Sequence, residues 1–110
     1  MEPKVPDRIA PVLRELKERL SQMYGERLRG LYLYGSYARG DFSVGSDVDV
    51  AVVLRGPVNA AKEIDRIGEV ASELSLRHGV TLSILPLSEH RWQEWQSPLL
   101  KNLRREGIPV

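Results

Sequence analysis

The chain has 110 residues, of which 42% are hydrophobic and 28% are charged. This balance predicts a single soluble globular domain over residues 1–110 and excludes a disordered chain. Sixteen basic and 15 acidic residues give a net charge of +1, and there is no cysteine. We therefore expect no direct nucleic-acid binding, no disulfide and no thiol catalysis. No apolar stretch reaches about 18 residues, and the N-terminal segment MEPKVPDRIA has no signal-peptide core, so we expect a cytoplasmic protein without membrane contact.

The first predicted element is an amphipathic helix. Apolar residues from Ile9 to Met23 recur at helical spacing, which predicts a helix that runs to about Tyr24 and stops at Gly25. Pro11 must lie in the first turn of this helix, because a proline deeper inside would remove a backbone hydrogen bond and clash with the preceding turn.

A strand and a helical turn come next. Residues 28–34 are mostly apolar or aromatic, which predicts a strand that ends at Gly35. Ser36 is a favourable N-cap for a short helical turn over residues 37–39, and Gly40 is suited to close that turn.

The middle of the chain predicts a strand, a long helix and a third strand. The second strand covers residues 47–54, and the helix begins after a cap at Asn59 and ends at Gly79. The third strand covers residues 80–85 and is expected to stop at Pro86, which cannot donate a ladder hydrogen bond. The residues expected on the buried face of the helix are Ile64, Ile67, Ala71 and Leu74.

Two helices are expected after the third strand. Ser88 is placed to cap the first, and Ser97-Pro98 opens the second, which ends at Gly107. The predicted fold class is therefore α/β (α+β): a small mixed sheet flanked by helices. The short link over residues 36–46 permits either direction for the first pair of strands, and the sequence leaves that choice open.

Two aspartates at the start of the second strand need an explanation. Asp47 and Asp49 alternate with valines and lead directly into an apolar run. A side-chain period of two places both carboxylates on one face. Like charges about 6 Å apart repel by roughly 3 kcal/mol at an effective dielectric of about 20. The pair therefore predicts a bound cation.

Gly35-Ser36 predicts an anion site beside this pair. It lies at a strand-to-helix junction, where glycine allows close approach of a phosphate and a serine hydroxyl can donate to it. A phosphate-binding turn next to the carboxylates Asp47 and Asp49 is what a magnesium nucleoside triphosphate requires. Arg39 can either contact a phosphate or pair with Asp41, and the sequence leaves both readings open.

The stretch from Gly35-Ser36 through Asp47-Val48-Asp49 resembles the signature of the DNA polymerase β-like nucleotidyltransferase superfamily, and the short chain resembles its minimal nucleotidyltransferase (MNT) branch. The resemblance implies a polymerase β-like fold in which Gly35 and Ser36 hold a triphosphate. It implies that Asp47 and Asp49 are catalytic and coordinate two divalent cations, Mg2+ or Mn2+. The implied reaction is transfer of a nucleoside monophosphate from ATP or another NTP to an acceptor hydroxyl.

The resemblance also implies a partner. Small MNT proteins are commonly the antitoxin half of a pair whose other half is a HEPN-domain RNase toxin, and some transfer AMP to a tyrosine of that toxin. We therefore expect a protein partner and a hetero-oligomer rather than a separate acceptor domain within this chain.

The chain departs from the family pattern in its third strand. Active members of the superfamily add a third carboxylate from a later strand, whereas residues 80–85 contain no acid and Ser83 stands at the expected position. A neutral hydroxyl is a poor general base and a weak metal ligand. Two functions follow: a nucleotidyltransferase that acts on a protein partner, or a nucleotide-binding antitoxin that acts by contact alone.

Overall fold

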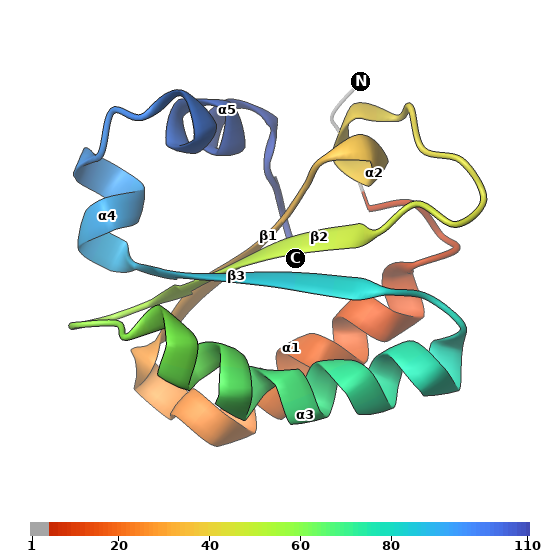
Figure 1. The fold of residues 1–110 in the computed structure, drawn as a ribbon, viewed down its shortest axis with the longest axis horizontal. Coiled ribbons are helices and arrows are strands. Elements are labelled where there is room, and N and C mark those ends of the chain that lie inside the picture. Colours follow the sequence, from red (N-terminus) through yellow and green to blue (C-terminus); the bar gives the residue numbers. More distant parts are fainter. Residues whose placement is uncertain (1–4) are drawn as a thin grey trace.

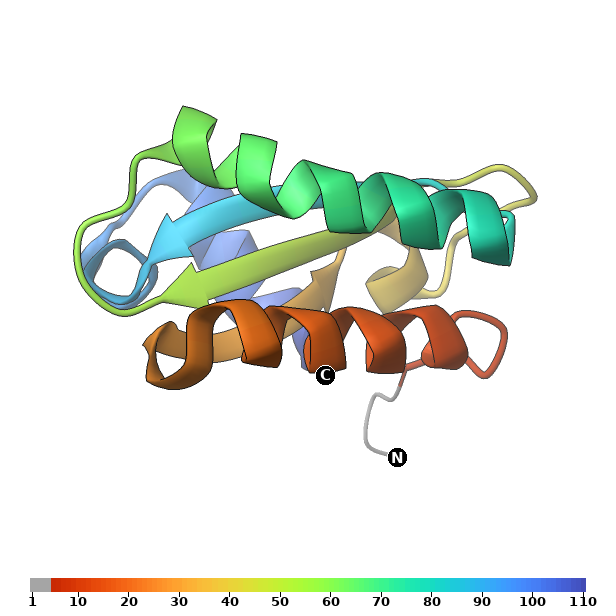
Figure 2. The same ribbon diagram turned by 90° about the horizontal axis from the view of Figure 1, so that it is seen from below.

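The computed structural model describes residues 5–110; the first four residues of the segment MEPKVPDRIA lie outside the described part. A four-stranded sheet of order β3-β2-β1-β4 forms the centre. Helices α1 and α3 cover one face of the sheet and α5 lies over the other (Figures 1 and 2). The elements are α1 (Ala10–Tyr24), η1 (Gly25–Arg27), β1 (Leu28–Tyr34), α2 (Ser36–Arg39), β2 (Val48–Leu54), α3 (Ala60–His78), β3 (Leu82–Ser88), α4 (Glu89–Glu94), α5 (Pro98–Glu106) and β4 (Ile108–Pro109).

The helix boundaries follow the capping residues that the sequence offers. Helix α1 has Pro11 in its first turn and ends before Gly25, whose φ is 54°. The Asn59 side chain accepts a hydrogen bond from Lys62 N at the start of α3, and α3 ends at Gly79 with φ 67°. These predictions for α1 and α3 are confirmed, because each of these residues meets a backbone requirement that few other residue types can meet. The predicted N-cap role of Ser36 was wrong: Ser36 is the first residue of α2, and the N-cap is Gly35, with no side-chain hydrogen bond.

The sheet is mixed, which answers the question that the sequence left open. β1 and β2 are antiparallel, β1 and β4 are antiparallel, and β2 and β3 are parallel. The long helix α3 makes the crossover that a parallel pair requires, whereas the shorter connection through α2 joins the antiparallel pair. The predicted fold class, a small mixed sheet flanked by helices, is confirmed.

The predicted bounds of the third strand were wrong. β3 covers Leu82–Ser88 and contains Pro86, which was expected to end it. β3 is an edge strand, so only one of its sides pairs with a neighbour, β2. Val48 N donates to Thr81 O. Every second residue from Thr81 onward therefore directs its backbone N–H and C=O toward β2. Pro86 has the opposite parity and faces outward, where its missing N–H removes no ladder hydrogen bond.

The expected inward position of Ile64 was also wrong. Its side chain is 47% exposed, whereas Ile67 and Leu74 are fully buried. The neighbouring Glu63 points inward instead and is only 4% exposed. The buried stripe of α3 begins at this carboxylate and continues four residues later at Ile67, which turns Ile64 toward solvent.

Glu63 is buried because it has polar partners between α1 and α3. The Tyr24 hydroxyl donates to Glu63 Oε1 at 2.7 Å, and the guanidinium groups of Arg27 and Arg66 lie 3.7 and 3.5 Å from its two oxygens. Burial and the hydrogen bond to Glu63 raise the pKa of Tyr24 to about 12. A buried carboxylate with these partners is a stabilising part of the fold, provided that all of them remain.

Tyr24→Phe is expected to lower the free energy of unfolding at pH 7 by about 1–2 kcal/mol, because it leaves a buried carboxylate short of one donor. The wild-type pKa lies above the ordinary value of 10.0, so this stabilisation is complete below pH 10 and decreases as the pH rises toward 12. Urea denaturation measures the difference. Tyr32→Phe is the control, because the Tyr32 ring stacks on Trp92 with centroids 4.5 Å apart and phenylalanine keeps that ring. An equal loss in both variants would contradict the stabilising role of the Tyr24 hydroxyl.

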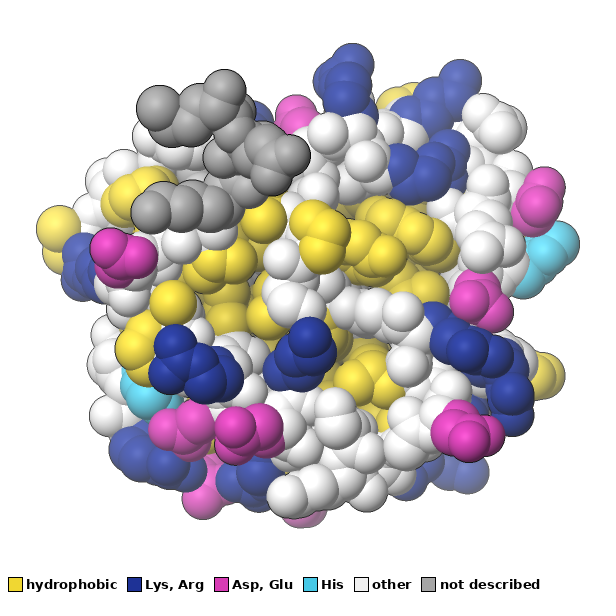
Figure 3. All heavy atoms as spheres, turned by 180° about the vertical axis from the view of Figure 1, so that it is seen from behind, with side chains coloured by type: hydrophobic (Ala, Val, Ile, Leu, Met, Phe, Trp, Pro, Cys, Tyr) yellow, Lys and Arg dark blue, Asp and Glu magenta, His cyan; other side chains and the backbone are white. Residues whose placement is uncertain are grey.

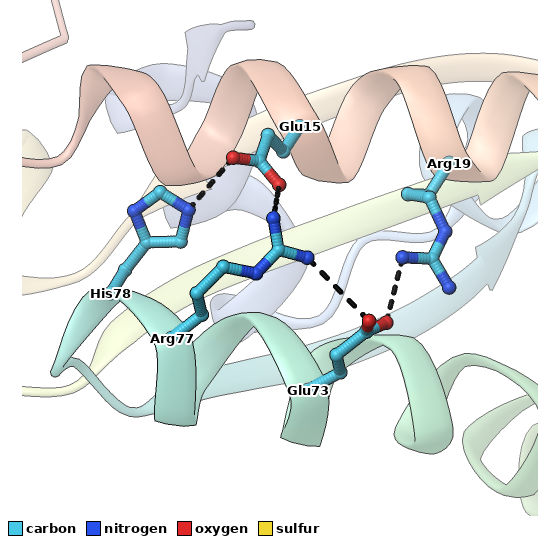
Figure 4. Close-up of polar contacts among 5 residues, drawn as sticks. All are labelled: Glu15, Arg19, Glu73, Arg77 and His78. Atoms are coloured by element: carbon cyan, nitrogen blue, oxygen red, sulfur yellow. Dashed lines mark hydrogen bonds and ion pairs between the residues drawn. The ribbon is translucent and has the colours of Figure 1, made fainter.

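A network of exposed ion pairs joins α1 to α3 (Figure 4). Arg77 and His78 contact the Glu15 carboxylate at 2.7 and 3.1 Å. Arg19 contacts Glu73 at 2.7 Å, and Arg77 also reaches Glu73 at 3.5 Å. Individual exposed pairs contribute little, but a connected network fixes how the two helices lie along each other.

The side of the molecule opposite to the view of Figure 1 carries hydrophobic side chains in a central hollow (Figure 3). A pocket of about 300 Å³ between α1 and the C-terminal residues is lined by Val5, Ala10, Leu13, Arg14, Lys17, Pro109 and Val110. Among residues 5–110, none of the helices combines the length and the apolar composition needed to cross a bilayer.

Candidate functional site

The candidate site begins with a row of three residues across the sheet. Tyr34 of β1 is the Cα partner of Asp49 in β2, and Asp49 is the Cα partner of Ser83 in β3. Side chains at paired positions point to the same face of a sheet. This is the face over which α5 lies, because the next side chain along β2 on that face, Ala51, packs with residues of α5.

Gly35 follows β1 directly and is held against Asp49. Its φ of 75° and ψ of −154° lie in a region that side chains strongly disfavour. A Cβ atom at this position would overlap Asp49 Oδ2 and lie 3.1 Å from its Cγ. Glycine is therefore required for two reasons. The backbone angles disfavour any side chain, and the Asp49 carboxylate packs against the Gly35 backbone and leaves no room for a Cβ atom.

A pocket of about 330 Å³ opens beside this contact. It brings together four of the five predicted site residues, Gly35, Ser36, Arg39 and Asp49, from the β1–α2 junction and the start of β2. Its opposite wall comes from α5. The complete lining is Tyr34, Gly35, Ser36, Arg39, Asp49, Leu99, Asn102, Leu103 and Glu106.

Asp47, the fifth predicted residue, lies outside the pocket lining. It precedes β2, which begins at Val48 rather than at the predicted residue 47, and its side chain is exposed. Asp49 is half-buried. Burial raises the pKa of Asp49, the Asp47 carboxylate raises it further, and Arg39 opposes both. The two carboxylates therefore interact, although only one of them lines the pocket.

Asp49→Asn is expected to stabilise the protein at pH 7 by about 0.5–1 kcal/mol in buffer without divalent cations, since it removes a charge that burial disfavours and that Asp47 repels. The folded-state pKa lies above the ordinary value of 3.8, so the wild-type free energy of unfolding falls as the pH rises from about 3.8 through the raised value. Denaturation between pH 3.5 and pH 7 tests this. The exposed Asp65→Asn is the control, and an Asp49→Asn protein that is less stable at pH 7 would contradict the prediction.

Arg39 pairs with acidic side chains in this structure. Its Nε lies 3.3 Å from Asp41 Oδ2, and its Nη1 lies 3.7 Å from Glu106 Oε2. Pairing with Asp41, one of the two readings that the sequence left open, is thus observed. Because Arg39 also lines the pocket, the second reading, contact with a phosphate, is sterically open as well.

The donor set fits a divalent cation incompletely. Among residues 5–110, no three Asp, Glu, His or Cys side chains lie together in a way that would hold a metal ion. Asp47 and Asp49 supply the oxygen ligands that Mg2+ prefers. Burial raises the pKa of Asp49 and the Asp47 carboxylate raises it further, so a positive charge here would favour the ionised form of Asp49. The next position along the row, Ser83, offers only a hydroxyl.

Sequence reasoning missed the contribution of α5 to the pocket. Leu99, Asn102, Leu103 and Glu106 recur at intervals of three and four residues, which places them on one face of a helix. That spacing was visible, but it could not show that this face covers Asp49.

A mixed sheet with a glycine turn packed on a strand aspartate is the arrangement expected of a polymerase β-like nucleotidyltransferase. The family model "Nucleotidyltransferase domain" matches residues 13–102, and the chain therefore belongs to the nucleotidyltransferase domain family. A protein of Methanocaldococcus jannaschii named "Putative protein adenylyltransferase" is 35% identical over 75 residues, which make up 68% of this chain and 75% of that protein.

Solved structures share the fold. A structure from Sulfolobus solfataricus described as a "putative nucleotidyltransferase" superposes with a TM-score of 0.62 at 20% identity, and the match covers 93% of this chain and 78% of that chain. A toxin–antitoxin complex with AMP-PNP gives a TM-score of 0.59 at 21% identity. The match covers 86% of this chain and 69% of that chain. A complex of a tri-AMPylated Shewanella oneidensis HEPN toxin with an MNT antitoxin gives a TM-score of 0.50 at 18% identity. The match covers 87% of this chain and 69% of that chain. The resemblance to the nucleotidyltransferase family is confirmed.

Proposed function

We propose that this protein is a Mg2+-dependent nucleotidyltransferase that transfers AMP from ATP to a hydroxyl of a protein partner, with pyrophosphate as the leaving group. The observation that carries this proposal is the contact between the Asp49 carboxylate and the Gly35 backbone at the floor of a pocket that also contains Ser36 and Arg39. This contact places an acidic group beside a turn suited to phosphate. The name of the Methanocaldococcus jannaschii relative supports adenylyl transfer to protein.

Each residue has a distinct role in this proposal. The Gly35 backbone and the Ser36 hydroxyl bind the triphosphate, and Arg39 exchanges its carboxylate partners for a phosphate oxygen. Asp47 and Asp49 would hold Mg2+ or Mn2+. A bound divalent cation would neutralise charge on the phosphates and lower the pKa of the attacking hydroxyl. Leu99 and Leu103 of α5 line the pocket and restrict the access of water to the nucleotide, so catalysis rests on positioning and electrostatics.

The proposed partner is a HEPN-domain toxin, bound in a hetero-oligomer in the cytoplasm. The support is the fold shared with an MNT antitoxin that was solved with an AMPylated HEPN toxin. In this arrangement the partner supplies the acceptor hydroxyl, and this chain supplies the nucleotide site.

Ser83 favours a second candidate function. Its position opposite Asp49 means that the row across the sheet contains one carboxylate and no acid on β3. If that position corresponds to the third carboxylate of active relatives, the protein is an antitoxin that binds nucleotide and neutralises its toxin by contact alone.

Radiolabelled ATP, Mg2+ and a HEPN-domain protein from the same genome separate the two functions. The enzyme is supported if label appears on the HEPN protein only when this chain is present. A complex that forms and suppresses RNase activity without any label, for all four nucleotides, would contradict transfer and support the binding-only function.

Ser83→Asp is expected to raise the transfer rate by about 100-fold, the lower end of the range for a positioned proton acceptor. The substitution also adds a third negative charge, so stability without Mg2+ should fall. Initial rates of partner labelling measure the effect. Thr81→Asp is the control, because Thr81 has the same strand parity but lies outside β3 and is exposed; an unchanged Ser83→Asp rate would show that this is not the position of the missing acid.

A further inference from the structure

Glu106 is a carboxylate inside the pocket proposed for the triphosphate. It is the last residue of α5, its side chain is 29% exposed, and its Oε2 lies 3.7 Å from Arg39 Nη1. Asp41 contacts the other end of the same guanidinium, at 3.3 Å from Nε. The one basic side chain of the pocket is thus held between two carboxylates, of which only Glu106 lines the pocket.

The backbone at Glu106 is anchored to the sheet. Gly107 N donates to Leu103 O at 2.7 Å, and the next residue, Ile108, pairs with Leu33 in β1. A Cβ at Gly107 would lie 2.6 Å from Leu103 O and 3.4 Å from the Tyr32 Cβ, so the chain leaves the helix in close contact with β1. The Glu106 carboxylate can therefore move by side-chain rotation, while the end of α5 stays in place.

We propose that the Glu106 carboxylate occupies an anion position beside Arg39 in the nucleotide-free protein and must leave that position before a triphosphate binds. The inference rests on the proposed function in that it assigns the pocket to phosphate. A triphosphate and Glu106 carry charge of the same sign and compete for one guanidinium, so the carboxylate lowers nucleotide affinity. Glu106 thereby sets the nucleotide concentration at which the site fills.

This role differs from that of a replacement for the acid missing at Ser83. The sheet order places β3 and β1 on opposite sides of β2. Glu106 lies toward β1 and the turn at Gly35, whereas Ser83 lies on the other side of Asp49. A carboxylate beside the turn at Gly35 opposes the binding of the triphosphate. A carboxylate on β3 would instead accept the proton of the acceptor hydroxyl.

Inorganic tripolyphosphate is the probe that tests the inference, with affinity measured by titration calorimetry at low ionic strength. Glu106→Gln is expected to bind it about 3- to 10-fold more tightly than wild type, with a smaller gain at higher salt. The gain should largely disappear in an Arg39→Ala background, because the competition is for that side chain. The control is Glu94→Gln, an exposed carboxylate on α4, which should bind like wild type.

The inference is overturned if Glu106→Gln binds tripolyphosphate no more tightly than wild type, or if neither protein binds it at about 10 mM. Weaker binding by Glu106→Gln would show instead that the carboxylate positions Arg39. Tripolyphosphate binding needs no turnover, so an absence of AMP transfer would contradict the proposed function alone, and unchanged affinity in Glu106→Gln would contradict this inference alone.

Discussion

Asp49→Asn is expected to reduce AMP transfer to the partner by about 10³-fold or more, the scale seen when an enzyme loses a group that stabilises charge in the transition state. Asparagine keeps the size and the contact with the Gly35 backbone but removes the negative charge that holds the cation. Asp47→Asn should have a similar effect, because the proposed function assigns the same cation to both carboxylates. The loss should lie in turnover while the protein stays folded, since Asp49→Asn is expected to be more stable than wild type.

The control for this experiment is Asp65→Asn, which removes an exposed carboxylate from α3. It should label the partner at the wild-type rate. A transfer rate for Asp49→Asn within about tenfold of wild type would contradict the assigned role of Asp49 and direct attention to another site on the chain.

Gly35→Ala is expected to lower the free energy of unfolding by about 3 kcal/mol, the combined scale for a strained backbone angle and a steric overlap. The methyl group cannot fit while Asp49 keeps its position, because it would overlap Oδ2. Either the turn or the carboxylate must move, so nucleotide binding should be lost together with stability. Guanidinium denaturation and nucleotide titration measure the two effects.

A matched glycine gives the opposite expectation. Gly68 lies within α3, and a Cβ there would meet nothing within 4 Å. Gly68→Ala should therefore stabilise the protein by about 0.5–1 kcal/mol through helix propensity. If Gly35→Ala were as stable as wild type and still bound nucleotide, the close packing of Gly35 on Asp49 would not be a requirement of the site.

Local rules predicted the features of the fold that depend on a few neighbouring residues. The ends of α1 and α3 follow from Gly25, Asn59 and Gly79, because a cap or a positive φ is decided within one turn of chain. The pairing of a glycine turn with a strand aspartate was also readable, since Gly35 and Asp49 are close in sequence and their chemistry is specific.

The errors arose where a distant element decides the outcome. β3 continues through Pro86 because β3 is an edge strand and Pro86 lies on the side that has no neighbouring strand. This could be predicted only with knowledge of the strand order in the sheet. Ile64 is exposed because Tyr24 of another helix gives Glu63 a buried partner. Glu106 lines the pocket because β4, which follows α5, pairs with β1 and so holds the end of α5 beside that strand. No local sequence pattern predicts this pairing.

We propose that the turn at Gly35 and the strand at Asp49 form a site for a magnesium nucleotide. Titration of the isotopically labelled protein with Mg2+ and a nonhydrolysable ATP analogue, followed by backbone amide NMR, tests it most directly. We expect saturable shifts at Gly35, Ser36, Asp49 and Glu106 that require Mg2+ and are absent in Asp49→Asn. Saturable shifts confined to residues away from this pocket, or no shifts at millimolar nucleotide, would contradict it.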